Sequence, residues 1–301
     1  MPTRIAVTGA NGQVGRAVLE RLQDFSVETI ALTREPGNLP ARRTLVCGLD
    51  SDRAFKAMHE ADAVIHLAGT LNPRSSNTYY AANVATTVAL ADAARDSNIK
   101  RVVFLSYVGA DECSSNEYLR TKAQAEQLLW STGISTVVFR CTHIVGPPDT
   151  PGPTAHALLS HDGETISILG SGRQMVAPIF LGDVVSAILM AVDKGRGGLY
   201  ELAGPERMNT DDLVRLLNRN ERVAVRHLPE RLARFLSIMH PGLPSPLVEV
   251  MVKPSVGDPS AAVKEFGIKL TSLRSVWKSD FKSDSRGEFT SAGREQQSSF
   301  V

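Results

Sequence analysis

The chain has few cysteines, almost no net charge and no apolar run of membrane-spanning length: its 301 residues include three cysteines, and its formal net charge is +1. Cys47, Cys113 and Cys141 are widely separated and form no C-x-x-C pair, which argues against a disulfide framework and against a zinc site. So small a charge gives no indication of a nucleic-acid or anionic-membrane partner. The apolar stretch 181–192 is shorter than the roughly 20 residues of a membrane span and contains Asp183. The first strand begins at residue 4, which leaves no room for a signal or transit peptide, so we expect a cytoplasmic protein.

The length and the hydrophobic content of 43% suit one large α/β domain with a smaller part appended. Short β-branched runs alternate with longer helical stretches through the first half of the chain. We expect strands at 4–8, 27–32, 44–47, 63–67, 101–106 and 136–141, and helices near 12–24, 51–59, 77–97 and 116–132. The strand at 63–67 is apolar almost throughout, as strands covered by helices on both faces are. We therefore predict an α/β fold with a parallel, doubly wound Rossmann sheet and a ligand crevice beyond the carboxyl ends of its strands.

The pattern changes after residue 145, where the proline- and glycine-rich segment 146–153 cannot form a helix interior. Beyond this segment we expect a strand at 165–169, a helix over 183–192 with Asp183 as its cap, and a strand at 198–204. The sequence that follows is mostly helical.

These changes divide the chain into three parts. We predict a dinucleotide-binding domain over 1–150, to which 177–204 returns, and a small, mostly helical substrate-side region made of 151–176 and 205–279. Residues 280–301 consist largely of Ser, Gly, Arg, Glu and Gln, which predicts a disordered tail.

The most informative motif follows the first strand, where Thr8-Gly9-Ala10-Asn11-Gly12-Gln13-Val14-Gly15 leads straight into a helix. Gly9 permits the tight turn off the strand, and Gly12, which has no Cβ, lets a pyrophosphate approach the backbone and the positive helix N-terminus. Gly15 lets the helix pack closely against the sheet. The spacing is G-x-x-G-x-x-G instead of the G-x-G-x-x-G of most Rossmann dehydrogenases, and a glycine triplet alone also fits an ordinary strand-to-helix turn. The flanking strand and helix favour a dinucleotide site, with cofactor-binding residues Gly9, Asn11, Gly12, Gln13, Val14 and Gly15.

Tyr118 and Lys122 begin the helix that precedes the sixth strand, and their spacing places both side chains on one helix face. A free tyrosine has a pKa of about 10, and a neighbouring ammonium, helped by an oxidised nicotinamide ring, lowers it toward neutral pH. Ser106 ends the fifth strand, where its hydroxyl can bond a substrate carbonyl oxygen as negative charge builds there. Asn83, in the preceding helix, can hold a water that relays protons to Lys122. A Tyr–Lys pair is common on helix surfaces, but together with the strand-end serine and the glycine turn it favours catalysis.

These residues together resemble the short-chain dehydrogenase/reductase superfamily, and most closely its extended and atypical branches, the NAD-dependent epimerase/dehydratase-like proteins. The resemblance covers about residues 4–275. Its motifs occur in order along the chain: Thr8 to Gly15, Val64-Ile-His-Leu-Ala-Gly69, Asn83-Val84, Arg101-Val-Val-Phe-Leu-Ser106, Tyr118-x-x-x-Lys122, Arg140-Cys-Thr-His-Ile-Val-Gly-Pro147, Leu169-Gly-Ser-Gly172 and Pro178-Ile-Phe-Leu-Gly-Asp183.

The resemblance implies a role for each candidate site residue. In such proteins the tyrosine is the acid/base, the lysine binds the nicotinamide ribose, the serine polarises the carbonyl and the asparagine completes a tetrad, which assigns these roles to Tyr118, Lys122, Ser106 and Asn83. It also implies that Leu67, Ala68 and Gly69 line the cofactor ribose. Residues 141–144, with His143 among them, would flank the nicotinamide.

The second strand leads to Arg34 and has no acidic residue at its end, where NAD-binding proteins usually place one to bond the ribose 2′-hydroxyl. A guanidinium instead matches a 2′-phosphate bidentately, so Arg34 favours NADP, with NAD as the alternative; a solvated loop arginine would have the same appearance. The segment Cys47-Gly-Leu-Asp50 departs from the usual Gly-Asp pair, so either Asp50 or Asp52 is expected to bond the adenine amino group.

Three departures from the family bear on the substrate. Where sugar-nucleotide epimerases carry an arginine that binds the diphosphate, this chain has Val176-Ala177, and Arg173 is out of register. The segment between Ser106 and Tyr118 is short, and His143 stands where those enzymes often have Asn. A lone histidine is more often a packing or hydrogen-bonding residue than a second acid/base. We therefore expect a small-molecule substrate that is less charged than a nucleotide sugar.

Two functions are compatible with these patterns. The first is an NAD(P)-dependent oxidoreductase acting on a carbonyl or alcohol, or an epimerase or dehydratase, in which Tyr118 transfers the proton, Lys122 tunes it and Ser106 orients the oxygen. The second is a non-catalytic NADP(H)-binding redox sensor or an assembly protein, because the branch also resembles complex I accessory subunits and NmrA-like redox-sensing regulators. Either function allows an oligomer or a protein partner.

Overall fold

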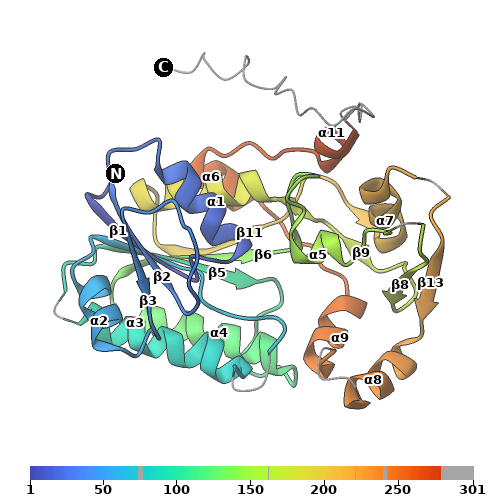
Figure 1. The fold of residues 1–301 in the computed structure, drawn as a ribbon, viewed down its shortest axis with the longest axis horizontal. Helices are drawn as coiled ribbons and strands as arrows, with labels where there is room; N and C mark the ends of the chain where they lie inside the picture. The colour runs from blue at the N-terminus through green and yellow to red at the C-terminus, as the bar shows by residue number, and fades with distance from the viewer. Residues whose placement is uncertain (74–76, 96, 162, 221, 240–242, 279–301) are drawn as a thin grey trace.

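A seven-stranded sheet forms the centre of the protein in the computed structural model, which describes residues 1–73, 77–95, 97–161, 163–220, 222–239 and 243–278 (Figure 1). In spatial order its strands are β11 (Gly198–Leu202), β6 (Ser135–Cys141), β5 (Arg101–Tyr107), β4 (Ala63–His66), β1 (Arg4–Thr8), β2 (Glu28–Thr33) and β3 (Arg43–Val46). Every neighbouring pair is parallel. The strand order reverses between β1 and β4, so the loops after these strands open a crevice between them. The predicted parallel, doubly wound α/β sheet is confirmed.

Helices cover both faces of the sheet because its inner strands are apolar on both sides. In β1, Ile5 and Val7 face one core, whereas Ala6 faces the other. The first core is closed by α1 (Gln13–Leu22), α6 (Leu181–Asp193) and α10 (Ser260–Phe266), and the second by α2 (Asp52–His59), α3 (Thr86–Ala94) and α4 (Glu117–Ser131). Figure 1 shows these two groups of helices on opposite sides of the sheet.

The position of α10 departs from the predicted division of the chain. Residues 205–279 were assigned to the substrate-side region, but Phe266 of α10 packs edge-on against Phe139 of β6 and Tyr200 of β11, with ring centres 5.3 and 4.9 Å apart. This aromatic contact holds α10 on the sheet, beside α6.

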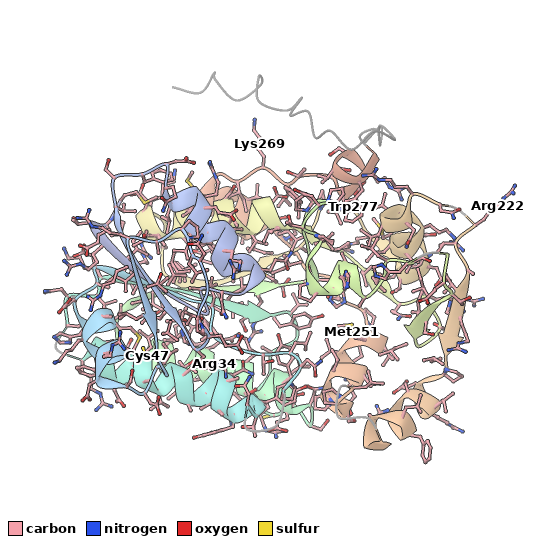
Figure 2. All side chains as sticks on the ribbon, viewed as in Figure 1. Arg34, Cys47, Arg222, Met251, Lys269 and Trp277 are labelled. Carbon is pink, nitrogen blue, oxygen red and sulfur yellow. The ribbon has the colours of Figure 1, made fainter. Side chains whose placement is uncertain are left out.

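The remaining elements lie mostly beyond the carboxyl ends of the sheet strands, at the right of Figure 1. They are β7 (Ile144–Val145), α5 (Gly152–His156), β8 (Ile166–Leu169), β9 (Met175–Val176), β10 (Ile179–Phe180), β12 (Met208–Asn209), α7 (Thr210–Asn218), β13 (Val225–Leu228), α8 (Glu230–Met239), α9 (Ser245–Val252) and α11 (Leu273–Lys278). The short strands pair as β7–β10, β9–β12 and β8–β13. Trp277 of α11 ties the chain's last described helix to the proline-rich segment, because its Nε1 donates to the Gly146 carbonyl at 3.2 Å (Figure 2).

The helix expected near 77–97 is present and begins as a π-helix, η1 (Tyr80–Ala85), that continues into α3. The expected role of Asp183 as a helix cap was wrong. Asp183 does not cap its helix, which begins at Leu181; instead its carboxylate accepts from the backbone N and Oγ1 of Thr271 at 2.6 and 2.7 Å. The tail predicted at 280–301 lies outside the described residues. None of the described helices has the length and apolarity needed to cross a membrane.

Candidate active site

The three glycines of the first turn have distinct steric roles. Gly9 has φ +63°, and a Cβ there would lie 2.6 Å from the Leu67 carbonyl carbon, so only glycine fits where this turn meets the end of β4. A Cβ on Gly15 would lie 2.5 Å from the Gly9 oxygen, so glycine there lets α1 pack closely against the backbone of the turn. Gly12 differs, because its Cβ would meet only the Gly9 oxygen, at 3.2 Å, and its other side faces the pocket described next.

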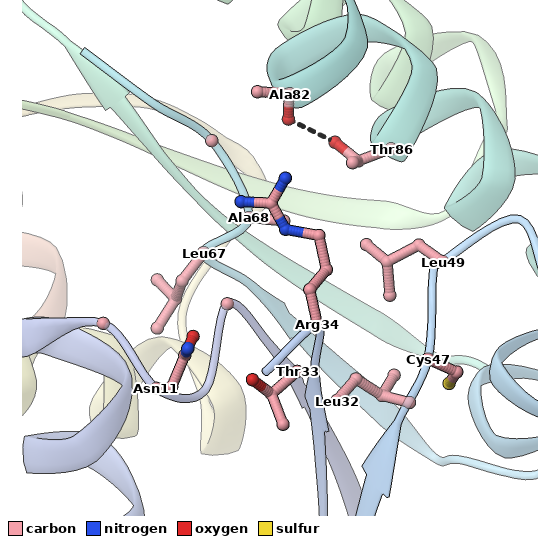
Figure 3. Close-up of a pocket in the computed structure, with 13 residues that line it drawn as sticks. Asn11, Leu32, Thr33, Arg34, Cys47, Leu49, Leu67, Ala68, Ala82 and Thr86 are labelled. Atoms are coloured by element: carbon pink, nitrogen blue, oxygen red, sulfur yellow. Dashed lines mark hydrogen bonds between the residues drawn. The ribbon is translucent and has the colours of Figure 1, made fainter. Parts of the chain in front are cut away.

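A pocket of about 160 Å³ opens at the carboxyl ends of β1, β2 and β4 (Figure 3). Among the predicted cofactor-binding residues, it is lined by Gly9, Asn11, Gly12, Arg34, Leu67, Ala68 and Gly69. Residues that the sequence did not single out also line it: Leu32, Thr33, Cys47, Leu49, Ala82 and Thr86. Its place beside a helix N-terminus, with glycine backbone on one side and apolar side chains on the other, fits the pyrophosphate and adenosine of a dinucleotide.

Asp50, Gln13 and Val14 were also expected to bind the cofactor, but they do not line this pocket. Asp50 is exposed and does not line it, whereas Cys47 and Leu49 do. Gln13, the first residue of α1, points to the proline-rich segment, where its Nε2 donates to the Pro151 carbonyl at 3.4 Å. Val14 packs against the first core.

Arg34 follows β2 and reaches across the pocket, as Figure 3 shows. Its Nη1 donates to the Asn77 side-chain oxygen at 2.7 Å, and it forms no ion pair within the described part of the chain. The guanidinium therefore meets a neutral amide, which leaves its positive charge available to an anionic ligand.

Tyr118 and Lys122 both point inward from α4. The N-cap of this helix, Asn116, accepts from the Leu119 backbone and donates to the Pro246 carbonyl and Glu249, so α4 begins in contact with α9. Only 8% of Tyr118 is exposed. Its ring packs against Tyr79 and Tyr107, with ring centres 5.9 and 5.7 Å apart.

Lys122 is held between a backbone oxygen and an aromatic ring. Its Nζ donates to the Leu105 carbonyl at 2.6 Å and lies 4.1 Å from the centre of the Phe104 ring. Burial lowers the Lys122 pKa to about 8, although Glu126 acts in the opposite direction.

Asn83 and Lys122 both lie next to Gly69, which lines the pocket. Asn83 sits in the π-helix, where its Nδ2 donates to Thr121 Oγ1 at 3.0 Å and its Oδ1 accepts from the Thr70 backbone at 3.2 Å. A Cβ on Gly69 would lie 2.8 Å from Asn83 Oδ1 and 3.7 Å from Lys122 Nζ. Gly69 thus connects the pocket to two of the four predicted catalytic residues.

The expected lowering of the Tyr118 pKa is wrong for this arrangement. Burial raises the Tyr118 pKa, and the neighbouring Tyr107, Cys141 and Tyr79 raise it further. Lys122 is not among the groups that lower the Tyr118 pKa; its Nζ donates to the Leu105 carbonyl instead.

Ser106 does not join this group. Its Oγ donates to the Glu126 carboxylate at 2.5 Å, and the same carboxylate accepts two hydrogen bonds from Arg140 at 3.0 and 2.6 Å. Because successive strand residues face opposite sides, the next residue, Tyr107, is the one that packs against Tyr118. Ser106 and Tyr107 point to opposite faces of β5, and Tyr118 lies on the Tyr107 face. The predicted role of Ser106 is wrong for this reason.

His143 lies near Tyr107, not in the pocket. Its Nδ1 is 3.4 Å from the Tyr107 hydroxyl, and burial lowers its pKa to about 4. Ser255, a second partner of that hydroxyl at 3.1 Å, was not singled out in the sequence.

His66, at the end of β4, is a further buried polar residue, one that the sequence patterns did not single out. Its Nδ1 is 2.8 Å from Thr8 Oγ1 and its Nε2 is 3.0 Å from Thr87 Oγ1. Thr87 in turn donates to the Asn83 carbonyl at 2.6 Å. A histidine within an otherwise apolar strand, opposite Thr8 in the β1–β4 register, was the available signal.

The sequence model of the NAD dependent epimerase/dehydratase family matches residues 5–203, which include the glycine turn, Asn83, Tyr118 and Lys122. The chain belongs to this family, whose Rossmann fold and NAD-binding turn the structure displays. Within the described residues, no group of three or more His, Cys, Asp or Glu side chains could hold a metal ion.

The curated relatives share a low sequence identity with this chain, and their names describe different activities. NADH dehydrogenase [ubiquinone] 1 alpha subcomplex subunit 9, mitochondrial, of Arabidopsis thaliana is 26% identical over 226 residues, which are 70% of this chain and 56% of that protein. The dTDP-glucose 4,6-dehydratase of Escherichia coli is 25% identical over 270 residues, covering 70% of this chain and 74% of the relative. The 4-hydroxy-2-methyl-3-oxo-4-farnesyl-3,4-dihydroquinoline-1-oxide ketoreductase of Stigmatella aurantiaca is 28% identical over 235 residues, covering 65% and 66%. The match thus spans little more than half of the Arabidopsis protein.

Solved structures share the fold over nearly the whole chain. MoeE5 in complex with UDP-glucose and NAD superposes with a TM-score of 0.74 at 20% identity, covering 91% of this chain and 96% of that chain. UDP-glucuronic acid 4-epimerase from Bacillus cereus, in complex with UDP-glucuronic acid and NAD, gives a TM-score of 0.72 at 19% identity, with the same coverage.

Proposed function

We propose that this protein is an NADP(H)-dependent oxidoreductase that interconverts a carbonyl compound and an alcohol, with Tyr118 as its acid/base. The observation that carries the proposal is the convergence at Gly69, which lines the dinucleotide pocket and lies next to both Asn83 Oδ1 and Lys122 Nζ. A nicotinamide cofactor held in the pocket that Gly12 and Arg34 line would supply or accept the hydride. Tyr118 then gives a proton to the substrate oxygen during reduction, or takes one during oxidation.

Each neighbouring residue has a defined part in this proposal. Lys122, fixed by the Leu105 carbonyl and the Phe104 ring, would hold the cofactor ribose with its ammonium group. Asn83 keeps the π-helix against α4 through Thr121 and presents its oxygen beside Lys122. A π-helical turn at such a position is common at functional sites.

The cofactor preference rests on Arg34. Its guanidinium crosses the pocket without a carboxylate partner among the described residues, and β2 ends without an acidic side chain. These features support NADP, whose 2′-phosphate a guanidinium binds well, over NAD, which stays the alternative.

The substrate we propose is an apolar carbonyl compound, not a nucleotide sugar. Tyr118 lies in an apolar cluster with Leu119 and Val250, against which Leu71 and Met251 pack. Met251 belongs to α9, and Figure 2 shows it at the edge of that helix. The two solved neighbours named above carry nucleotide sugars, but Arg173, the nearest candidate for gripping a diphosphate here, is exposed.

A second candidate is a cofactor-binding sensor or assembly protein without turnover. Two observations favour it: the raised pKa of the buried Tyr118, and the similarity to a mitochondrial complex I subunit. Such a protein would bind NADP, and the buried group around Tyr118 would stabilise its fold without catalysing a reaction.

Cofactor titration followed by a substrate panel tests the proposal. We expect calorimetry to give tighter binding of NADP than of NAD, and we expect NADPH absorbance to fall when apolar ketones and aldehydes are added. Binding of neither cofactor would contradict both candidates, whereas tight NADP binding without turnover of any carbonyl would favour the second.

A further inference from the structure

Tyr107, Ser255 and His143 form a buried hydrogen-bonded group directly beside Tyr118. The Tyr107 hydroxyl lies 3.1 Å from Ser255 Oγ and 3.4 Å from His143 Nδ1. The exposed fractions of these three residues are 9%, 1% and 7%. The Tyr107 and Tyr118 rings meet edge to face, at 62° between planes.

One arrangement of protons within this group leaves the Tyr107 proton available to a third partner. A phenol has one proton to donate and two lone pairs that accept. The Ser255 hydroxyl can donate to one lone pair, and a neutral His143 with its proton on Nδ1 can donate to the other. If both neighbours donate, the Tyr107 proton is directed to a third partner.

Backbone bonds fix Ser255 where it meets the tyrosine. The Ser255 backbone N donates to the Met175 carbonyl at 2.9 Å, and the Ala177 backbone N donates to the Ser255 carbonyl at 2.8 Å. The bond between Tyr107 and Ser255 therefore joins the end of β5 to the segment after α9, across the crevice between the sheet and the remaining elements.

We propose that Tyr107, positioned by Ser255 and His143, supplies the hydrogen bond to the substrate oxygen that the sequence had assigned to Ser106. This inference rests on the proposed function, in which Tyr118 transfers the proton to the same oxygen. Negative charge builds on that oxygen when hydride reaches the carbonyl carbon, and a fixed donor in a buried site stabilises it. Ser106 cannot serve, because its own proton is given to Glu126.

Single-hydroxyl variants test the inference in steady-state reduction of the substrate found with the carbonyl panel. Tyr107→Phe should lower kcat by about 10²–10³-fold, the usual effect of losing one donor to a developing oxyanion, with KM and the NADPH affinity nearly unchanged. Tyr79→Phe is the matched control, since it removes a phenol hydroxyl of the same cluster whose proton goes to the Leu71 carbonyl at 3.0 Å. Tyr79→Phe and Ser106→Ala should both keep kcat within about threefold.

A pair of Ser255 variants covers the case in which Tyr107→Phe fails to fold. Ser255→Ala removes one donor that positions Tyr107, and we expect a several-fold lower kcat at constant KM. Ser255→Thr keeps the hydroxyl and should restore kcat, which a purely structural role for the position would not predict.

The outcomes separate this inference from the proposed function. If Tyr118→Phe abolishes turnover while Tyr107→Phe, or the Ser255 pair in its place, leaves kcat unchanged, then the inference is wrong and the proposed function stands. A large loss in Ser106→Ala would also overturn it. If Tyr118→Phe turns over normally, or no carbonyl is reduced, the proposed function fails and the role of Tyr107 fails with it.

Discussion

The hydroxyl of Thr8 lies 2.8 Å from Nδ1 of His66, directly across the register of β1 and β4. Thr8 Oγ1 already accepts from the backbone N of Leu67 and of Ala68, at 3.1 and 3.2 Å, so its proton is the one given to His66. Thr87 donates its proton to the Asn83 carbonyl and so accepts from His66 Nε2. His66 is therefore neutral, with its proton on Nε2, and links the pocket backbone to the π-helix.

This neutral histidine predicts acid sensitivity. Burial, with the Lys122 charge, lowers the His66 pKa to about 3, and burial lowers that of His143 to about 4, from 6.5 in each case. Below pH 6.5 these histidines are protonated in the unfolded chain but stay neutral in the folded chain. Their neutral state therefore contributes fully to the free energy of unfolding above pH 6.5, and this contribution is lost as the pH falls toward 4. Between pH 6.5 and 5, each histidine should lower the free energy of unfolding by roughly 2 kcal/mol.

Urea unfolding of His66→Asn at a series of pH values checks this. The variant should lose about half of the histidine-linked slope, whereas His161→Asn, which changes an exposed histidine, should follow the wild type. The same slope in His66→Asn and in the wild type would mean that His66 takes up a proton in the folded protein.

Gly12→Val should abolish cofactor binding while the chain still folds. The φ and ψ of Gly12 are −71° and 168°, which any residue adopts, and its Cβ would meet only the Gly9 oxygen. The valine side chain would instead occupy the place proposed for the pyrophosphate. Calorimetric titration with NADP and NAD measures this, with Gly37→Val as a control outside the pocket. Unaltered affinity in Gly12→Val would refute the pocket assignment.

Arg34→Ala should weaken NADP binding by about 1–3 kcal/mol, the scale of a lost charge-assisted hydrogen bond, and leave NAD binding nearly unchanged. The control is Arg43→Ala, which removes an exposed arginine of β3 that does not line the pocket. Comparable losses of affinity for NADP and NAD would show that Arg34 does not bind the 2′-phosphate.

The features that could be predicted from the sequence are those fixed by local geometry. Gly9 and Gly15 follow from backbone sterics in a strand-to-helix turn, and helical spacing alone places Tyr118 and Lys122 on one face. The alternation of apolar strands and helices gave the parallel sheet, because few topologies bury such strands.

The features that could not be predicted depend on register or on contacts between distant segments. A shift of one residue in β5 decides whether Ser106 or Tyr107 faces Tyr118. The partner of Tyr107, Ser255, is 148 residues away in sequence. The loop after β3 likewise turns Leu49 into the pocket and leaves Asp50 exposed, which no spacing rule specifies.

The turnover of Tyr118→Phe at saturating NADPH, relative to the wild type, tests the central claim most directly. The change keeps the ring that packs between Tyr79 and Tyr107 and removes only the ionisable hydroxyl. We predict that kcat falls by about 10²–10⁴-fold while NADP affinity, measured by calorimetry, holds. Equal turnover by Tyr118→Phe and the wild type would contradict the assignment of Tyr118 as the acid/base and, with it, the proposed mechanism.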